Sequence, residues 1–312
     1  MKRAYETNYW NLEKLCEEAY QSGGPYWHIC TDGNFQKDIF LCDEEFKIAM
    51  NCMAFCILEY GIDLIAFVIM NNHIHFIVEC AKEKSLSFFN DFRIRVKHCL
   101  SYRQKSSLLD GFECDEPIAI TSLQQLRNEI VYIHRNPFVA RQDTLPYNYQ
   151  WSSGCLYFNE ATAHIPAKSY SQLTYKERRA LHTSSKLPVP ESFRIRNGFI
   201  LPESFIDIPR CERYFRHASH YFFSLTKNLE AYSEVSQRLG DNICLNDEEV
   251  FSAASLIAKN TLGVERLNLL VGDQSRIVAI ELHNKYKASI KQISRILKLS
   301  IDQLNQLFPQ KE

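Results

Sequence analysis

The sequence has no excess of positive charge, no long hydrophobic run and few glycines or prolines. Its 312 residues include 36 lysines and arginines against 37 acidic residues, which gives a formal net charge of −1. This balance provides no general attraction for nucleic acid, so any DNA contact must come from a local basic surface. No segment has the length of a membrane span or the pattern of a signal peptide. We therefore expect a soluble, cytoplasmic protein that does not enter a membrane.

The cysteines lack the spacing of a structural metal site. There are eleven of them, an odd number, and no Cys-x-x-Cys pair occurs. Cys52 and Cys56 are four residues apart in a helical segment, but no second pair follows them. The pattern predicts reduced thiols, several of them buried, in a reducing compartment.

A buried strand and the turn after it organise the first half of the chain. The apolar run 64–70 has the length of a buried strand, and Asn71-Asn72 is typical of a turn. The residues then alternate in type, with His73 and His75 on one side and Ile74, Phe76 and Val78 on the other. On a strand, the two histidines therefore share a face, about 6–7 Å apart along the backbone.

Two neutral imidazoles on one strand face can bind a single metal ion from the same side. The alternative is a pair of surface histidines on a solvated sheet face, and a metal site would need a further ligand from elsewhere in the chain. His28, in the expected first strand 26–31, is either a sheet-surface histidine or a neighbour of this site, and the surface position is favoured.

The segment 123–136 is predicted to form a helix that carries polar chemistry. Its apolar residues recur at helical spacing and form one stripe, Leu123, Leu126, Ile130 and Ile133. At about 100° per residue, Tyr132 lies away from this stripe, and Asn136 is one turn further along the face of Tyr132. Pro137 is expected to end the helix. The pattern predicts a tyrosine on the polar side of the helix with an amide beside it.

Three motifs, in their order along the chain, resemble those of a known family. They are Met-x-Asn-His-hydrophobic-His at 70–75, Tyr-Ile-His-x-Asn-Pro at 132–137 and Trp-Ser-Ser at 151–153. This combination resembles the single-tyrosine transposases of the HUH class, in particular their REP-associated branch. The resemblance covers about residues 24–153.

The resemblance implies a catalytic tyrosine and a divalent metal site. In this family the two histidines and the polar residue four after the tyrosine bind the metal, and the tyrosine attacks a phosphate of single-stranded DNA. Carried over, the metal ligands are His73, His75 and Asn136, and the nucleophile is Tyr132. Two imidazoles and an amide oxygen suit Mg²⁺ or Mn²⁺ better than a closed zinc site, although Zn²⁺ stays open. The implied partner is single-stranded or hairpin DNA, and a homodimer is left open because relatives act as dimers or as monomers.

The chain departs from the family pattern at two places. Asn71 stands where the family usually has proline, at a turn position that hardly touches the chemistry. The tryptophan- and arginine-containing segment that the family has between its two motifs is missing or shortened around 110–117. This second departure concerns hairpin recognition more than catalysis.

The order of the expected elements predicts an α+β fold. A strand at 26–31, a helix at 43–60, a hairpin into the histidine strand and a helix at 85–103 indicate an antiparallel sheet with packed helices, of the ferredoxin or RRM type. A further helix is expected at 1–22, and Asp43 is expected to cap the helix at 43–60. The predicted organisation is a nuclease domain at 1–153, an irregular connector at 154–210 and an all-α region at 211–312.

Two segments offer basic or helical surfaces for DNA. The helix 85–103 and the residues after it carry a basic cluster, Arg93, Arg95, Lys97, Arg103 and Lys105. Such a cluster is either a solvated face or a set of phosphate contacts. The segment 289–307 has helix–turn–helix spacing, with Ser300 as the cap of the second helix. A plain helical bundle used for packing is the alternative for this segment.

Three functions are compatible with these residues. The first is a single-stranded DNA endonuclease and strand transferase that acts through a 5′-phosphotyrosine, as in DNA transposition and recombination. The second is a DNA-binding regulator that keeps the fold but does not cut. The third is a metal-binding protein in which Tyr132 is incidental. The presence of all four motif residues favours the first.

Overall fold

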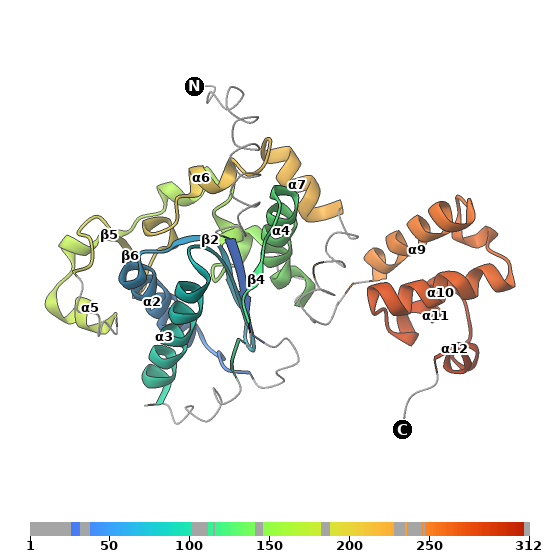
Figure 1. Cartoon of the computed structure of the whole chain (residues 1–312), viewed down its shortest axis with the longest axis horizontal. Coiled ribbons are helices and arrows are strands. Elements are labelled where there is room, and N and C mark those ends of the chain that lie inside the picture. The colour runs from blue at the N-terminus through green and yellow to red at the C-terminus, as the bar shows by residue number, and fades with distance from the viewer. Residues whose placement is uncertain are drawn as a thin grey trace. The chain divides into compact units, whose positions relative to one another are not determined.

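A computed structural model describes residues 26–31, 38–101, 112–114, 116–140, 146–181, 188–227, 235, 245 and 247–308 (Figure 1). The described residues fall into two compact units, of which the first extends to Leu225 and the second begins at Thr226, apart from the end of one helix at 139–140. The first unit is α+β with antiparallel sheets, and the C-terminal unit is helical. The predicted fold class is confirmed. The expected helix at 1–22 lies outside the described residues.

The main sheet has four strands, β1 (Tyr26–Cys30), β2 (Asp63–Ile69), β3 (Ile74–Glu79) and β4 (Ile118–Ala119). They lie in the order β2-β3-β1-β4, and each neighbouring pair is antiparallel. Helix α2 (Asp43–Tyr60) connects β1 to β2, and α3 (Lys82–Ser101) connects β3 to β4. This β-α-β-β-α-β order is the ferredoxin-like arrangement that the sequence predicted.

Helices α2 and α3 begin and end largely where their sequences indicate. Gly61 ends α2 in the left-handed conformation, with φ 52°. Asp43 is the first residue of α2 and not its cap, because Cys42 occupies the cap position, although its side chain makes no capping hydrogen bond. Helix α3 packs on one face of the sheet, where the rings of Phe88 and Phe92 lie 5.5 and 5.3 Å from that of Phe76.

Helix α4 (Leu123–Ala140) lies on the opposite face of the sheet from α3 (Figure 1). The expected end at Pro137 is wrong, since the helix continues for three residues beyond the proline. A proline removes one backbone donor, so α4 lacks one backbone hydrogen bond at Pro137. The helix is buried on its polar side too, at Arg127, Glu129, His134, Arg135 and Asn136.

A short segment after α4, residues 149–157, runs along the outer edge of β2, and we call it the β2 strap. Ser153 Oγ accepts a hydrogen bond from Phe67 N at 2.9 Å, and Trp151 O accepts one from Ile69 N at 2.9 Å. Tyr157 Oη donates to Ile65 O at 2.8 Å. The Trp-Ser-Ser motif therefore satisfies the edge of the sheet that would otherwise lie open.

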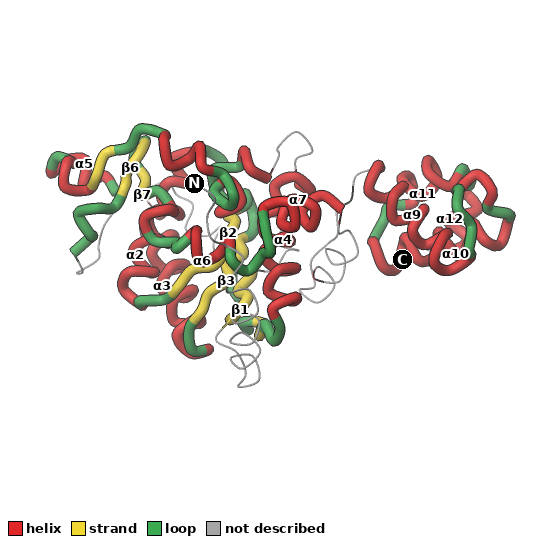
Figure 2. Tube along the Cα trace, turned by 90° about the horizontal axis from the view of Figure 1, so that it is seen from above, coloured by secondary structure: helices red, strands yellow, loops and turns green. Residues whose placement is uncertain are grey.

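Residues 154–181 and 188–210 pack into the first unit, which differs from the predicted irregular connector. They form a second antiparallel sheet, β5 (Lys168–Ser169), β6 (Arg194–Arg196) and β7 (Phe199–Ile200), together with α5 (Tyr175–Ala180). Strand β7 lies beside α2 (Figure 2). The Asn51 side chain of α2 donates to Gly198 O at 3.1 Å and accepts from Ile200 N at 2.9 Å.

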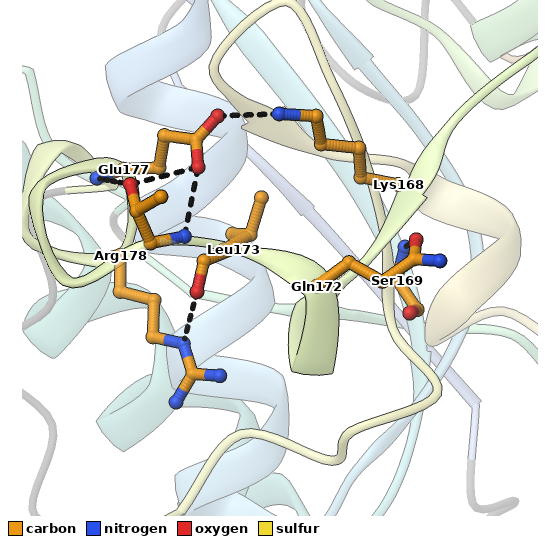
Figure 3. Close-up of polar contacts among 7 residues, drawn as sticks. Lys168, Ser169, Gln172, Leu173, Glu177 and Arg178 are labelled. Carbon is orange, nitrogen blue, oxygen red and sulfur yellow. Dashed lines mark hydrogen bonds and ion pairs between the residues drawn. The ribbon is translucent and has the colours of Figure 1, made fainter.

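Apolar packing and helix caps explain why this segment is ordered. Its apolar residues form one cluster with Ala54 and Phe55 of α2, namely Leu173, Leu181, Val189, Phe193, Ile195 and Ile200. Glu177 accepts a hydrogen bond from Lys168 Nζ (Figure 3). The Glu177 carboxylate also accepts hydrogen bonds from the backbone and the hydroxyl of Thr174, the cap residue of α5. The strands are only two or three residues long, so the sequence carries too little alternation to predict them.

The remaining helices of the first unit are α6 (Ile208–Glu212) and α7, which starts at Ala218 and ends at Lys227. The C-terminal unit contains α9 (Asp247–Leu262), α10 (Gly272–Tyr286), α11 (Ile290–Leu297) and α12 (Ile301–Leu307). Short 3-10 helices are η2 (Pro146–Asn148), η3 (Ser153–Cys155), η4 (Glu160–His164), η5 (Tyr170–Gln172), η6 (Pro202–Ser204) and η7 (Leu267–Leu269).

The helix–turn–helix spacing at 289–307 corresponds to α11 and α12. Ser300 Oγ accepts a hydrogen bond from Gln303 N at 3.2 Å, which confirms the expected cap of the second helix. The turn contains no glycine, and Lys298 takes the left-handed conformation there with φ 57°. Helix α12 buries Leu304 and exposes the polar side chains Gln303, Asn305 and Gln306. Among all described helices, none combines the length and hydrophobicity needed to cross a bilayer.

Candidate active site

The antiparallel pairing of β1 and β3 gathers three potential ligands on one face of the sheet. Cys30 lies directly opposite His75, and His28 lies opposite Ile77, so His28 is a diagonal neighbour of His75. His28 and His75 are fully buried, and Cys30 is half-buried. Ligand atoms of His28, Cys30 and His75 all lie within 4.8 Å of one another, so this cluster could hold a metal ion.

One face of α4 covers these side chains. Glu129, Tyr132 and Asn136 are spaced by three and four residues, which places them on one side of a helix. The ring of Tyr132 lies 5.6 Å from that of His75 and 6.5 Å from that of His28, measured between centroids. Tyr132 is only 2% exposed.

The turn before β3 positions His73. Met70 N donates to His73 O at 2.9 Å, and the backbone of Asn71 accepts hydrogen bonds from Ile39 and Phe40. His73 Nδ1 lies 2.8 Å from Asn72 Oδ1, and His73 Nε2 lies 3.2 Å from Asn136 Oδ1. The His73 and His75 rings are 5.2 Å apart. The structure thus brings together all four residues that the motifs singled out.

One expectation about this region is wrong. His28 is not a surface histidine, because its imidazole is enclosed between the sheet and α4. Tyr132 lies on the polar side of α4, and this side is buried because it covers the histidines. The His28 imidazole lies inside the unit because Glu129 and His75 are its hydrogen-bond partners.

A hydrogen-bonded chain joins α4 to the sheet through His28. Glu129 Oε2 lies 2.6 Å from His28 Nδ1, and His28 Nε2 lies 3.0 Å from His75 Nδ1. Glu129 was not among the residues expected in the site. The available signal was its position three residues before Tyr132, which puts the carboxylate on the same face of the helix.

The histidine at the centre of the site is held neutral. Burial, and to a smaller extent the nearby His28 and His73, lower the pKa of His75 well below its ordinary value of 6.5. A neutral imidazole can bind a metal ion without first losing a proton. His75 belongs to both possible ligand sets, one with His28 and Cys30 and one with His73 and Asn136.

The basic cluster of α3 is largely occupied by carboxylates. Arg93 pairs with Glu113, and Arg95 pairs with both Asp91 and Glu59. Arg93, Arg95 and Lys97 are all half-buried. Arg103 and Lys105 lie outside the described residues. A DNA phosphate would have to compete with these carboxylates for the two arginines.

Comparisons with known proteins add little to this geometry. No family model matches the sequence, and no curated protein matches it. Among solved structures, the chain is similar to a REP-associated tyrosine transposase bound to a REP hairpin, with a TM-score of 0.37 and 13% identity. That similarity covers 56% of this chain and 94% of the transposase. A likeness this distant says nothing about activity, so any assignment depends on the site itself.

Proposed function

We propose that the protein is a metal-dependent single-stranded DNA endonuclease and strand transferase that acts through a 5′-phosphotyrosine. The observation that carries this proposal is the meeting of four side chains from two distant motifs. The ring centroids of Tyr132 and His75 lie 5.6 Å apart, and His73 and Asn136 adjoin the same site. The proposed partner is single-stranded or hairpin DNA.

The residues present fit a divalent metal ion. If His73 donates its Nδ1 proton to Asn72 Oδ1, then His73 Nε2 and Asn136 Oδ1 present two lone pairs to one another 3.2 Å apart, which a cation would satisfy. The amide nitrogen of Asn136 is buried and has no hydrogen-bond partner among the described residues. We propose that His73, His75 and Asn136 hold Mg²⁺ or Mn²⁺. When bound, such an ion supplies charge stabilisation at the scissile phosphate.

The reaction exchanges one phosphoester for another. Tyr132 Oη attacks the phosphorus in line, the bond from phosphorus to the 3′ oxygen breaks, and that oxygen leaves as a 3′-hydroxyl with a proton. The 5′ phosphate stays on the tyrosine, so the bond energy is kept and the reverse step can join DNA ends. Because Tyr132 is 2% exposed, the phosphate reaches its hydroxyl only after a local rearrangement of the site.

The second candidate is a DNA-binding regulator that does not cut. One observation favours it, namely the burial of Tyr132. A regulator of this kind would bind DNA without forming a covalent product. The two candidates therefore differ in one observable property, the covalent adduct.

Labelled DNA distinguishes the candidates. Single-stranded and hairpin oligonucleotides, labelled at either end, are incubated with the protein and Mn²⁺ and run on a denaturing gel. A 5′-phosphotyrosine predicts that the 3′-end label stays with the protein and the 5′-end label leaves on a shorter strand. Binding without any adduct would support the regulator, and a 5′-end label on the protein would contradict the proposed polarity.

A further inference from the structure

A hydrogen-bonded chain runs from Glu129 through His28 to the proposed ligand His75, and its first two members have no part in the reaction described above. All three side chains are fully buried. They come from three elements, with Glu129 on α4, His28 on β1 and His75 on β3. A buried chain of this kind must be satisfied at each position, because an unpaired polar group inside a protein is costly.

These two hydrogen bonds meet the conditions under which His75 can bind a metal ion through Nε2. Binding through Nε2 requires the proton of His75 on Nδ1, and that proton needs an acceptor, which is His28 Nε2 at 3.0 Å. His28 Nε2 accepts only if the proton of His28 is on Nδ1. That proton also needs an acceptor, which is Glu129 Oε2 at 2.6 Å. A carboxylate has only acceptors, so with Glu129 ionised and His28 neutral the direction of the chain is fixed from Glu129 outward.

We propose that Glu129 and His28 are positioning residues that hold His75 in the tautomer with Nδ1 protonated, so that Nε2 is its ligand atom. The proposal rests on the proposed function, because it assigns a role toward the metal ion of that same site. Histidine ligands commonly donate their other ring proton to a carboxylate or another acceptor, which fixes the ring and its tautomer. Here an imidazole stands between the ligand and the carboxylate.

The same contacts align the nucleophile with the ligand. Glu129 and Tyr132 are three residues apart on α4. The hydrogen bond between Glu129 and His28 of β1 therefore also fixes the position of Tyr132 relative to the sheet. The rings of His28, His75 and Tyr132 form a triangle, with the centroid of His28 5.2 Å from that of His75 and 6.5 Å from that of Tyr132. His28 thus contacts both α4 and the histidine strand.

The competing arrangement makes His28 a ligand together with Cys30. Metal binding by His28 Nε2 or His75 Nδ1 would break the 3.0 Å hydrogen bond between those two atoms. The two arrangements are therefore mutually exclusive at this bond. They also differ in the role of the Cys30 thiol, which binds the metal ion in the competing arrangement and does not bind it in the proposed one.

The first test reads the tautomers directly and needs no substitution. Nitrogen-15 NMR of the histidine rings is recorded on the metal-free full chain near neutral pH. The proposal predicts a protonated Nδ1 and an unprotonated Nε2 for both His75 and His28. A proton on Nε2 of His75 would overturn it.

The second test measures the affinity for Mn²⁺ alone by electron paramagnetic resonance. His28→Leu removes the acceptor and should weaken Mn²⁺ binding about 10–100-fold, the usual effect of losing a group that orients a metal ligand. His28→Gln keeps an acceptor oxygen near the position of Nε2 and should restore most of the affinity. Cys30→Ser should leave it unchanged. Equal losses in both His28 variants, or a loss in Cys30→Ser, would assign His28 as a ligand and overturn the proposal.

Failure of this inference and failure of the proposed function give different results. Neither test contains DNA. Correct tautomers and tight Mn²⁺ binding without a DNA adduct would leave the positioning role intact and refute the nuclease. An adduct formed by a protein whose His75 carries its proton on Nε2 would leave the nuclease intact and refute the positioning role.

Discussion

At the scale of single residues, His134 shows how one motif serves two purposes. It lies between Tyr132 and Asn136 in the sequence, but its side chain contacts residues outside the histidine site. Its Nε2 lies 2.7 Å from Ser153 Oγ and its Nδ1 lies 2.9 Å from Tyr221 Oη. Burial lowers the pKa of His134 from 6.5 to about 3, so the ring is neutral in the folded protein. The motif thus combines a reactive face with a histidine that joins α4 to the β2 strap.

The neutral state of His134 predicts a pH dependence of stability. Its pKa is lower in the folded state, so the unfolded chain binds one more proton as the pH falls below about 6.5. The free energy of unfolding should therefore decrease from pH 6.5 toward pH 3, and His134 should contribute nothing to the slope above pH 6.5. Urea unfolding at pH 7.5 and 5 should show a smaller decrease for His134→Gln than for the unchanged chain. Equal decreases would contradict this account.

Single substitutions also separate the two ligand sets for the metal ion. Loss of an imidazole ligand should abolish or greatly weaken Mn²⁺ binding in His73→Ala, and the double variant with His75→Ala should bind none. Cys30→Ser serves as the control and should bind as the unchanged chain does. Calorimetric titration with Mn²⁺ gives the affinities. Undiminished binding in His73→Ala together with a loss in Cys30→Ser would move the site to the cluster of His28, Cys30 and His75.

The residues that sequence reasoning found are those whose partners lie within one element. His73 and His75 share one short stretch, and Tyr132 and Asn136 share one helix turn, so spacing alone places each pair. The partners of His28 are 47 residues away at His75 and 101 residues away at Glu129. Such contacts depend on strand register and helix packing, which local spacing does not contain. The interpretation of His28 as a surface residue failed for this reason.

At the scale of elements, the β2 strap explains a motif that the chemistry does not use. Ser152 Oγ donates to Phe67 O at 3.1 Å, and Tyr149 Oη donates to Ile69 O at 2.9 Å. Trp151 stacks on Phe46 of α2, with ring centroids 5.1 Å apart. Strand β2 pairs with β3 on its other side, so the strap also supports the strand that carries the histidines.

Removing the Ser153 hydroxyl should therefore destabilise the first unit. Ser153→Ala leaves Phe67 N and His134 without one hydrogen-bond partner each, which should lower the free energy of unfolding by about 1–3 kcal/mol. Ser87→Ala is the matched control, because its exposed hydroxyl bonds only within α3. Urea unfolding of both variants checks the difference, and equal stability of the two would contradict the role of the strap.

At the scale of the whole molecule, the described residues separate into an α+β unit and a helical unit. Apart from the two-residue β4, the strands and helices up to α4 were predictable because each is long and strongly patterned. The second sheet was not, since its strands are two or three residues long and depend on packing against α2. The C-terminal helices were predictable from their caps, such as Ser289 with Gln292 and Ser300 with Gln303.

The C-terminal unit should contribute to DNA binding and not to chemistry. Its α11 and α12 have helix–turn–helix spacing, and α12 exposes polar side chains that can reach base edges. A chain that ends after Leu225 should bind target DNA more weakly than the full chain but form as much adduct at saturating DNA. Circular dichroism confirms that the shorter chain is folded. Equal affinity of the two chains for target DNA would mean that the C-terminal helices pack together without contributing to DNA binding.

The central claim is that Tyr132 is the nucleophile. Other tyrosines near the site lack its surroundings, since Tyr147 is 45% exposed and Tyr149 binds the backbone of β2. Tyr102 lies outside the described residues. Phenylalanine at position 132 keeps the ring and its packing against His75, so the fold should be preserved.

The most direct measurement compares covalent DNA adducts of Tyr132→Phe and Tyr147→Phe with single-stranded DNA and Mn²⁺. The account predicts no adduct with Tyr132→Phe, a normal adduct with Tyr147→Phe, and unchanged unfolding of both variants. A Tyr132→Phe protein that still becomes linked to DNA would contradict the account, because the phosphate would then be held by another residue.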